Sequence, residues 1–526
     1  MQGLVENYAH APLGLATVAA LTPSDIEVQV IDENIEEIPF DTDADIVGFT
    51  AFNVQIRRAV ELSQEFRKRG KKVVLGGPYV SLIPDRFEEI FDVLFVGEAE
   101  NIWPQFCRDL QSGAVQKCYT EPDKIDITKS PVPRYDLLRN DHYNAYYLQT
   151  SRGCPFTCEF CDIIITNGRV PRTKELDQIM AEVESVRRLG GTSITFSDAN
   201  FIGNSKYAKD LLVRLAEFGQ KHRFPIRFTA ELTINVADRE DLLDLMQQAN
   251  FGALFFGIES PRASSLKETK KGVNLMSPLI QSIRKIQSRG IFPWAGMIVG
   301  FDHDDYAIFQ EQFAFLMEAG IPFTTSGILV AIPTTPLYNR LHAENRLSMT
   351  REEFRNASET WRGHGSDNLN FIPKLMSKEE LLKGYSWMIR QIYSYENFSK
   401  RMETCMQNFP QGSKEFPVRK FQASFKIDGK KGMQTFLRIL KYYLLTTDNV
   451  RRKFFLRTLF KVLKGRWTEW NFNFTIAYLV LQKHFHEYVT ETQGIPEEAS
   501  FLSPFHGWQE KQSAAHEPIA EPVNAA

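Results

Sequence analysis

The sequence predicts an α/β protein with a doubly wound N-terminal domain, a partial (β/α)6 barrel and a mainly helical C-terminal domain. Two stretches support this, because short apolar runs alternate with helical patterns over residues 1–125 and again over residues 146–345. From about residue 346 the alternation stops, and helical patterns rich in aromatic residues follow. The chain has 526 residues, which is enough for two to four domains with sizeable cores.

The first alternation is typical of a Rossmann-like parallel sheet. It predicts buried strands at 26–31, 46–50, 73–75 and 93–96, and helices at 59–69 and 99–110. Ligands of such sheets bind beyond the carboxyl ends of the strands. The segments there are Ile31-Asp-Glu-Asn34, Thr50-Ala-Phe-Asn-Val-Gln55, Gly76-Gly-Pro-Tyr79 and Val96-Gly-Glu-Ala-Glu100. Gly76 and Gly77 would let the backbone approach a bulky ligand, although tight βα turns would use the same residues.

The second alternation predicts six βα units, with chemistry expected at the C-terminal rim of the strands. Strands are expected at about 146–151, 192–198, 226–231, 253–258, 294–300 and 326–331. The helix after the first strand has Ile179, Val183, Val186 and Leu189 at helical spacing, with Thr173 as its N-cap. A polar, Pro-containing stretch at 121–134 marks the linker. We place the boundaries at 1–125, 126–145 (linker), 146–345, 346–506 and 507–526, the last a tail whose composition predicts disorder.

Three cysteines in one short loop give the strongest chemical signal. Cys154, Cys158 and Cys161 have the spacing C-x3-C-x2-C directly after the first barrel strand. Three thiolates at this spacing can hold three irons of a [4Fe–4S] cubane and leave the fourth iron open to a ligand. Structural zinc would need four ligands, and no further Cys or His lies nearby at zinc-finger spacing. A disulfide would use two of the thiols and leave the third reactive.

This loop resembles the signature loop of radical S-adenosylmethionine (SAM) enzymes. The resemblance implies that the three cysteines ligate a [4Fe–4S] cluster and that its open iron binds the amino and carboxylate groups of SAM. It also implies SAM contacts at Phe160, Ser197, Asp198, Glu231, Glu259 and Gly300. A carboxylate at a strand end is, however, also common as a capping or ion-pairing residue.

The N-terminal domain resembles the cobalamin-binding domain of B12-dependent radical SAM proteins. Pro12-Leu-Gly-Leu15, Gly76-Gly-Pro-Tyr79 and Gly97-Glu-Ala-Glu100 carry this resemblance. It implies cobalamin contacts from Asp32, Thr50, Asn53, Gly76, Gly77, Pro78, Gly97 and Glu98. The chain has no Asp-x-His-x-x-Gly motif, so no histidine is nominated as a lower ligand of cobalt. In the family Pro-Leu-Gly-Leu follows a first strand, and we expect this domain to lack that strand.

Residues 367–374 and 384–393 resemble the C-terminal extension of one subgroup, which includes the bacterial hopanoid C-2 methylases. The resemblance implies a cobalamin-dependent radical SAM methyltransferase that methylates an unactivated carbon of a hopanoid or another lipid. It also implies a reducing donor such as flavodoxin or ferredoxin. Two alternatives stay open: a non-methylating enzyme that cyclises or rearranges its substrate, and a cobalamin or iron–sulfur sensor without turnover. A methylthiotransferase is not expected, because its N-terminal domain would carry a second cysteine trio.

Charge is unevenly distributed along the chain. The net charge is −3, yet residues 414–466 contain fifteen Lys and Arg against three Asp and Glu. The pattern over 433–464 predicts amphipathic helices that either lie on an anionic membrane or, more commonly, dock on the core with a basic solvent face. No nucleic-acid fold motif is present, so no nucleic-acid partner is expected.

Cysteine usage and hydropathy predict the compartment. Outside the loop the cysteines are scattered, which favours a reducing cytosol. Neither a signal peptide nor an apolar run of transmembrane length is visible. A lipid substrate would fit with contact between the basic segment and the inner face of the membrane.

Overall fold

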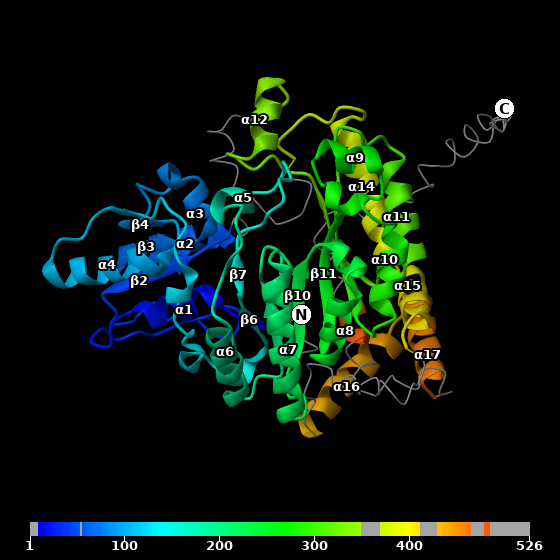
Figure 1. Ribbon diagram of the computed structural model, residues 1–526, viewed down its shortest axis with the longest axis horizontal. Helices are drawn as coiled ribbons and strands as arrows, with labels where there is room; N and C mark the ends of the chain where they lie inside the picture. Colours follow the sequence, from blue (N-terminus) through cyan, green and yellow to red (C-terminus); the bar gives the residue numbers. More distant parts are fainter. Residues whose placement is uncertain are drawn as a thin grey trace.

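Two parallel sheets stand side by side in the computed structural model, and a group of helices covers the outer side of the larger sheet. The structure describes residues 9–52, 55–348, 369–410, 429–463, 478–483 and 486. Figure 1 shows the smaller sheet and its helices in blue beside the larger sheet in cyan to green, with the C-terminal helices in yellow to orange on the far side. The arrangement confirms the expected α/β class with a helical C-terminal part.

The smaller sheet has four parallel strands, in the order β2-β3-β4-β5, with helices on both faces. Side chains alternate along β3, so that Val73 and Leu75 pack with α2 and α3 whereas Val74 packs with α4. This confirms the doubly wound arrangement. The elements are β2 (Ile46–Thr50), α2 (Ile56–Lys68), β3 (Lys72–Gly76), α3 (Pro78–Leu82), β4 (Val93–Val96), α4 (Ala99–Ser112) and β5 (Cys118–Thr120).

The N-terminal residues depart from expectation. Residues 26–31, expected as a strand, form none. Their apolar side chains are buried by packing instead, with Ile26 against the smaller sheet's core and Val30 in the larger sheet's core. The prediction was wrong because alternating burial requires a surface to pack on and not a hydrogen-bond ladder. The first strand, β1 (Ala9–Ala11), pairs with β6 (Tyr143–Leu148) of the larger sheet, and α1 (Leu13–Leu21) packs into the same core.

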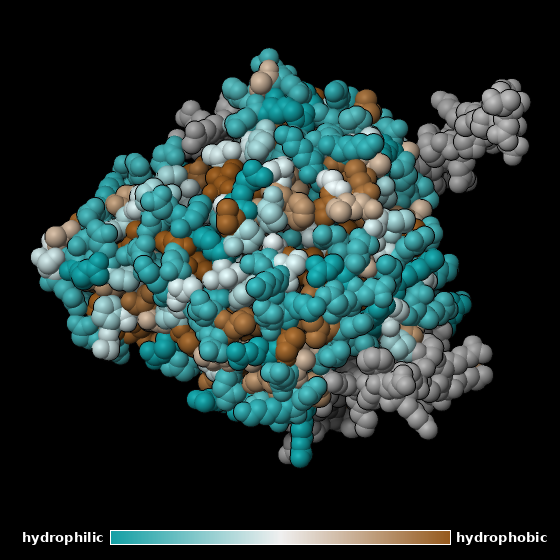
Figure 2. Space-filling model, in the orientation of Figure 1, coloured by the Kyte–Doolittle hydropathy of each residue, from teal (hydrophilic) through white to brown (hydrophobic). Residues whose placement is uncertain are grey.

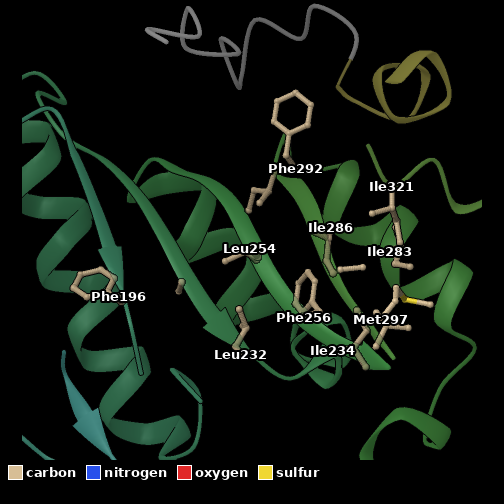
Figure 3. Packing of buried hydrophobic residues seen from close by; sticks show 14 of the residues in the cluster. Phe196, Leu232, Ile234, Leu254, Phe256, Ile283, Ile286, Phe292, Met297 and Ile321 are labelled. Carbon is tan, nitrogen blue, oxygen red and sulfur yellow. The ribbon is translucent and has the colours of Figure 1, made fainter. Parts of the chain in front are cut away.

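The larger sheet has seven parallel strands, in the order β1-β6-β9-β10-β11-β12-β13. The six expected barrel strands are all present, and β1 adds a seventh at one edge. Figure 3 shows buried residues of the strands, such as Leu254 and Phe256, near Ile286 of a covering helix, and Phe196 farther along the same core. The strands are β6 (Tyr143–Leu148), β9 (Ser193–Phe196), β10 (Arg227–Leu232), β11 (Phe251–Glu259), β12 (Phe292–Val299) and β13 (Phe323–Ile328).

The helices that follow the strands are α5 (Ile163–Thr166), α6 (Leu176–Arg188), α7 (Ser205–Lys221), α8 (Glu240–Gln248), α9 (Ala263–Glu268), α10 (Leu279–Gln287), α11 (Ile308–Ala319) and α12 (Pro336–Ala343). Of these helices, α6, α7, α8, α10 and α11 cover the outer face of this sheet, whereas α5 packs on α3 and α12 contacts the cysteine loop. Short 3-10 helices are η2 (Pro84–Arg86), η3 (Ile127–Lys129), η4 (Tyr135–Leu137), η5 (Asn140–His142), η6 (Ile234–Asp238) and η7 (Gly272–Leu275).

Helix α6 begins later than expected. Thr173 lies in β8 (Arg172–Thr173), which pairs antiparallel with β7 (Ser151–Arg152). The N-cap is Glu175, whose backbone N–H donates to Gln178 Oε1 (3.3 Å). The assignment of Thr173 as N-cap was therefore wrong, because the β7–β8 ladder already uses its backbone.

The helical prediction for the basic segment is confirmed by α16 and α17. Helices α14 and α15 pack on α11, and α17 packs on α15 and α16. Among the described residues, no helix combines the length and the hydropathy needed to cross a membrane. The tail at 507–526 lies outside the described residues. The bounds are α14 (Lys378–Tyr393), α15 (Tyr395–Gln407), α16 (Gly429–Leu444) and α17 (Asn449–Leu463).

Candidate active site

The cysteine loop leaves the larger sheet after β6 and is closed by the β7–β8 ladder. The Cys154 N–H donates to the carbonyl oxygen of Gly168 (3.1 Å). Gly153 has φ +105°, and a Cβ there would lie 2.5 Å from the carbonyl oxygen of Val170. A side chain at this position would force the two ends of the loop apart, so the residue before Cys154 has to be glycine.

All three thiols are shielded from solvent to some degree. Cys158 is buried, and Cys154 and Cys161 are partly buried. Burial raises the pKa of Cys158, and it raises the pKa of Cys161 to about 12, against the attraction of Lys271. Among the described residues, no three Cys, His, Asp or Glu side chains are grouped as ligands of one metal ion. Three thiols from one loop, one for each of three irons, are the donor set of a [4Fe–4S] cluster whose fourth iron is open.

Asp198 organises the start of the loop. Its Oδ1 accepts hydrogen bonds from the backbone N–H of Thr150 (2.9 Å), from the Thr150 hydroxyl (3.0 Å) and from the backbone N–H and hydroxyl of Ser151. The side chain is fully buried, and burial raises its pKa to about 6 in spite of these donors. Asp198 therefore holds the strand end before the cysteines. Its Oδ2 has no protein partner among the described residues, and a contact with SAM stays a prediction.

Glu231 lies on the inner face of the curved sheet. Along β10 it alternates with Ala230 and Leu232, which are buried in the core under the helices. Burial, together with the negative charge of Asp198, raises the pKa of Glu231 to about 7. At neutral pH this carboxyl group can therefore either donate or accept a proton.

Glu259, at the end of β11, is held in a different way. It has φ +63°, an uncommon conformation for a residue with a side chain, and its Oε1 pairs with Lys271 Nζ (3.1 Å). A Cβ at Gly257 would lie 2.3 Å from the same Oε1, so glycine makes room for the ion pair. Lys271 also brings positive charge toward Cys158 and Cys161, and these interactions with the carboxylate and thiols raise its pKa although burial opposes them.

The remaining residues predicted for SAM lie near the same rim. Phe160 is partly buried, with its ring centroid 6.0 Å from that of Phe301. Ser197 is partly buried, and its hydroxyl donates to the carbonyl oxygen of Leu148 (3.3 Å). Gly300 is buried with φ +105°, so it can contribute only backbone. The structure thus brings all of these residues to the C-terminal ends of the strands, as expected, while their roles stay predictions.

The residue after Cys158 ties the loop to the C-terminal region. The Glu159 carbonyl oxygen accepts from the N–H of Leu337 (2.9 Å), and its carboxylate pairs with Arg340 (2.6 Å). Arg340 also pairs with Asp302 (2.7 Å). Helix α12 is therefore fixed directly on the cysteine loop.

The ends of β2 and β3 form an open edge lined by glycine. Thr50 and Pro78 are exposed, and Gly76 and Gly77 are partly exposed. Gly77 has φ +109°, and a Cβ there would lie 2.8 Å from Thr50 Oγ1. Close to this edge in the chain, Phe52 is 59% exposed. Accessible backbone, with an exposed aromatic residue two positions after Thr50, fits a large flat ligand such as cobalamin.

The other residues predicted for cobalamin have varied surroundings. Asp32 is buried, and its Oδ2 accepts from the hydroxyl of Tyr143 (3.0 Å). Gly97 is exposed with φ +105°. The carboxylate of Glu98 is occupied by two arginines that flank the cysteine loop. Asn53 lies outside the described residues.

Comparison with known proteins identifies the family of this chain. Three families match along the chain: B12 binding domain over residues 5–106, Radical SAM superfamily over 148–316, and Domain of unknown function (DUF4070) over 335–497. An uncharacterized methyltransferase of Synechocystis is 37% identical over 399 residues, which cover 75% of this chain and 73% of the relative. This chain belongs to the cobalamin-binding radical SAM enzymes. The hopanoid C-2 methylase of Rhodopseudomonas palustris is 36% identical over 343 residues, 64% of this chain and 65% of the relative.

A solved structure confirms the fold of this cobalamin-binding radical SAM enzyme. The cobalamin-dependent SAM radical enzyme OxsB with bound aqua-cobalamin has a TM-score of 0.59 and 14% identity, over 92% of this chain and 77% of that chain. The cofactors are a [4Fe–4S] cluster, SAM and cobalamin.

Several residues that shape the site were missed by the sequence analysis. No local pattern marks Lys271 or Arg340, whose carboxylate partners lie 12 and 181 residues away. Glu100 ends the segment Gly97-Glu-Ala-Glu100, and Arg152 lies two residues before Cys154. The opposite charges of these two residues were a signal that could have indicated an ion pair.

Proposed function

We propose that this enzyme methylates an unactivated carbon, with SAM as the methyl source and cobalamin as the methyl carrier. The observation that carries the proposal is that the helix directly after the cysteine loop packs on the helix that begins at the open edge of the smaller sheet. Helix α5, which follows Cys161, packs on α3, whose first residue is Pro78. The site where the radical forms would thus lie next to the site from which the methyl group is delivered. The methyltransferases among the relatives support this assignment.

The proposed reaction uses two SAM molecules and two electrons for each methyl group. One electron cleaves the first SAM to methionine and a 5′-deoxyadenosyl radical, which takes a hydrogen atom from the substrate to give 5′-deoxyadenosine. The second SAM gives up CH3+ and leaves as S-adenosylhomocysteine. The substrate radical, CH3+ and the second electron make the new C–C bond. A low-potential donor of the flavodoxin or ferredoxin class would supply the electrons.

The protein's own residues bind, orient and shield the cofactors. In this proposal the three cysteines ligate the cluster, and the rim residues Phe160, Ser197, Asp198, Glu231, Glu259 and Gly300 surround SAM or support its site. The described residues that border cobalamin in this proposal are Thr50, Gly76, Gly77, Pro78 and Gly97. Asn53, which lies outside the described residues, is proposed as a further contact from the sequence alone. The carboxylates of Asp32 and Glu98 are engaged within the protein, so in this proposal these two residues support the cobalamin site and their carboxylates do not contact the cofactor.

The inner face of the sheet favours an apolar ring system such as a hopanoid. Phe255 and Trp294 are neighbours in register, with ring centroids 5.9 Å apart, and the indole N–H of Trp294 donates to Thr325 Oγ1 (3.1 Å). Both alternate with buried core positions, so they face inward with Glu231. Because burial raises the pKa of Glu231 to about 7, much of this carboxyl is neutral near pH 7 and suits a hydroxyl better than a charged group.

Anaerobic turnover of the reconstituted, reduced enzyme tests the reaction type. We expect S-adenosylhomocysteine and 5′-deoxyadenosine in equal amounts together with a methylated product. Formation of 5′-deoxyadenosine alone would instead support cyclisation or rearrangement, and absence of both products would support a sensor. Lipid profiling of a deletion strain tests the substrate: loss of a 2-methylated hopanoid is expected, and an unchanged profile would exclude hopanoids.

We also propose that the basic helices bind an anionic membrane surface. Among the described residues fourteen large hydrophobic side chains are exposed, and five of them lie in α16, α17 and the loop between: Leu437, Leu445, Val450, Leu456 and Phe460. Exposed cations lie on the same two helices: Arg438, Lys441, Lys453 and Arg457. Interleaved apolar and cationic side chains suit an anionic bilayer surface. In Figure 1 α16 lies at the end of the larger sheet away from α5 and α12, so this contact would leave the cysteine loop uncovered.

Flotation on phosphatidylglycerol vesicles tests this contact. The wild-type protein is expected to float at low ionic strength, whereas a variant with the four exposed cations changed to glutamine should not. A control variant with four neutralised cations on other helices should float like the wild type: Lys68→Gln, Arg188→Gln, Arg214→Gln and Lys221→Gln. Wild-type protein that stays unbound, or a control that loses binding equally, would contradict the proposal.

A further inference from the structure

Four largely buried charged side chains connect the smaller sheet to the cysteine loop. Arg152 lies two residues before Cys154, and Arg172 is its partner across the β7–β8 ladder. Glu98 and Glu100 follow β4 of the smaller sheet. The four side chains are only 3% to 17% exposed. We call this group of four the interdomain clamp.

Each arginine of the interdomain clamp forms short ion pairs with one or both of the glutamates. Arg152 pairs with Glu98 (Nη1–Oε1, 3.0 Å) and with Glu100 (Nη2–Oε1, 2.7 Å). Both terminal nitrogens of Arg172 donate hydrogen bonds to the carboxylate of the same Glu98, at 2.8 Å and 3.0 Å. Two positive and two negative side chains therefore balance inside the protein. Burial disfavours the charged carboxylates, but the guanidinium groups outweigh it and hold the pKa of Glu98 and Glu100 below the usual range.

The chain that links the two sheets passes through the clamp. The backbone N–H of Ile125 donates to Glu98 Oε2 (2.9 Å), and the carbonyl oxygen of Ile125 accepts from Arg172. The hydroxyl of Ser130 donates to Glu100. The linker, the smaller sheet and the loop flanks therefore share one hydrogen-bonded network, in which movement of one part breaks contacts of the others.

The other flank of the loop is held by apolar contact. Helix α5 consists of three isoleucines and a threonine, and Ile165 packs against the core of the smaller sheet. Lys124 Nζ adds a hydrogen bond to the carbonyl oxygen of Thr166 (2.6 Å). Figure 2 shows hydrophobic side chains gathered on the face where α3 and α5 meet in Figure 1. Both ends of the cysteine loop are thus attached to the sheet that carries the cobalamin edge.

We infer that Glu98, Glu100, Arg152 and Arg172 are positioning residues that set the distance between the cluster loop and the cobalamin edge. The inference rests on the proposed function in one respect, since methyl transfer requires the two cofactors at a constant spacing. The clamp residues act through the loop and through β4, and they need not touch substrate, SAM or cobalamin. An ion-paired network suits this task, because paired guanidinium and carboxylate groups fix direction as well as distance.

Hydrogen exchange and cofactor spectroscopy of the full-length holoenzyme test the clamp. The variants are Arg172→Gln and Glu98→Gln. If Arg172→Gln does not fold, Arg172→Lys replaces it, because lysine keeps the positive charge but cannot form the bidentate pair with Glu98. The control is Arg289→Gln, since Arg289 is 19% exposed and pairs with Glu240 and Asp244 away from the loop.

Each clamp variant is expected to raise amide exchange in residues 93–125 and 151–173 together, by at least about tenfold, the factor that loss of one charge-assisted hydrogen bond predicts. The magnetic interaction between cob(II)alamin and the reduced cluster should indicate a wider range of cobalt–cluster distances. The cobalamin and iron contents of the protein should stay unchanged. The control should show neither the faster exchange nor the wider range of distances. Faster exchange in only one of the two segments, or an unchanged cobalt–cluster interaction, would overturn the inference. Neither readout needs a substrate, so failure of the proposed methyl transfer would leave this result standing.

Discussion

Replacing Gly77 with alanine probes the glycine edge that we assign to cobalamin. Gly77 has φ +109° and ψ 176°, a conformation that strains a residue with a side chain by about 1–3 kcal/mol. The added Cβ would lie 2.8 Å from Thr50 Oγ1 and 3.0 Å from the backbone N and O of Ala51. Overpacking of this kind costs about 1–3 kcal/mol more. We therefore expect Gly77→Ala to lower the free energy of unfolding of the smaller sheet by about 4 kcal/mol.

Gly70→Ala is the matched control. Gly70 has φ +76° with nothing within 4 Å of the position of a Cβ, so only backbone strain of about 1 kcal/mol is expected. Urea unfolding of both cobalamin-free variants should reveal the difference of about 3 kcal/mol. Titration with hydroxocobalamin, followed by absorbance, should show weaker binding to Gly77→Ala alone, with iron content unchanged in both. Equal unfolding midpoints and equal cobalamin binding would refute the reasoning.

Three further predictions concern the larger sheet. Cys158→Ala should abolish both iron–sulfur absorbance and 5′-deoxyadenosine formation after reconstitution, and retained SAM cleavage would contradict the assignment of the cluster. Burial and a nearby charge raise the pKa of Glu231 to about 7, so the stability that its protonated form contributes is lost as pH rises through about 7. Glu231→Gln should reduce the resulting fall in Tm with rising pH. Parallel profiles of Tm against pH for the variant and the wild type would show that Glu231 does not cause the fall. Arg340→Ala leaves the buried carboxylate of Glu159 with less compensation, so we expect a loss of about 2 kcal/mol and faster iron release to a chelator. Arg214→Ala, which breaks an exposed pair, should release iron at the wild-type rate.

Local patterns were sufficient for most of the fold. The alternation that predicted strands from 146 to 331 corresponds to β6 and β9 through β13. In a parallel sheet covered by helices each strand is buried, so its own run of apolar residues is enough to predict it. The same logic failed at residues 26–31, where Val30 is buried by packing without a ladder. It also failed at Thr173, whose backbone belongs to a two-residue ladder that no periodicity can indicate.

The features of the site can likewise be divided into those that local sequence predicted and those that only the structure revealed. The spacing of Cys154, Cys158 and Cys161 is a property of neighbouring residues, so the chain by itself predicted an iron–sulfur cluster, and the resemblance of its strand-end segments predicted cobalamin beside it. Only the tertiary structure decided that Asp198 turns inward to hold the loop and that Glu98 meets Arg152 and Arg172, 54 and 74 residues away. The physical reason is that an ion pair depends on which charges are buried together. That is set by how the two sheets pack, and no local run of residues contains it.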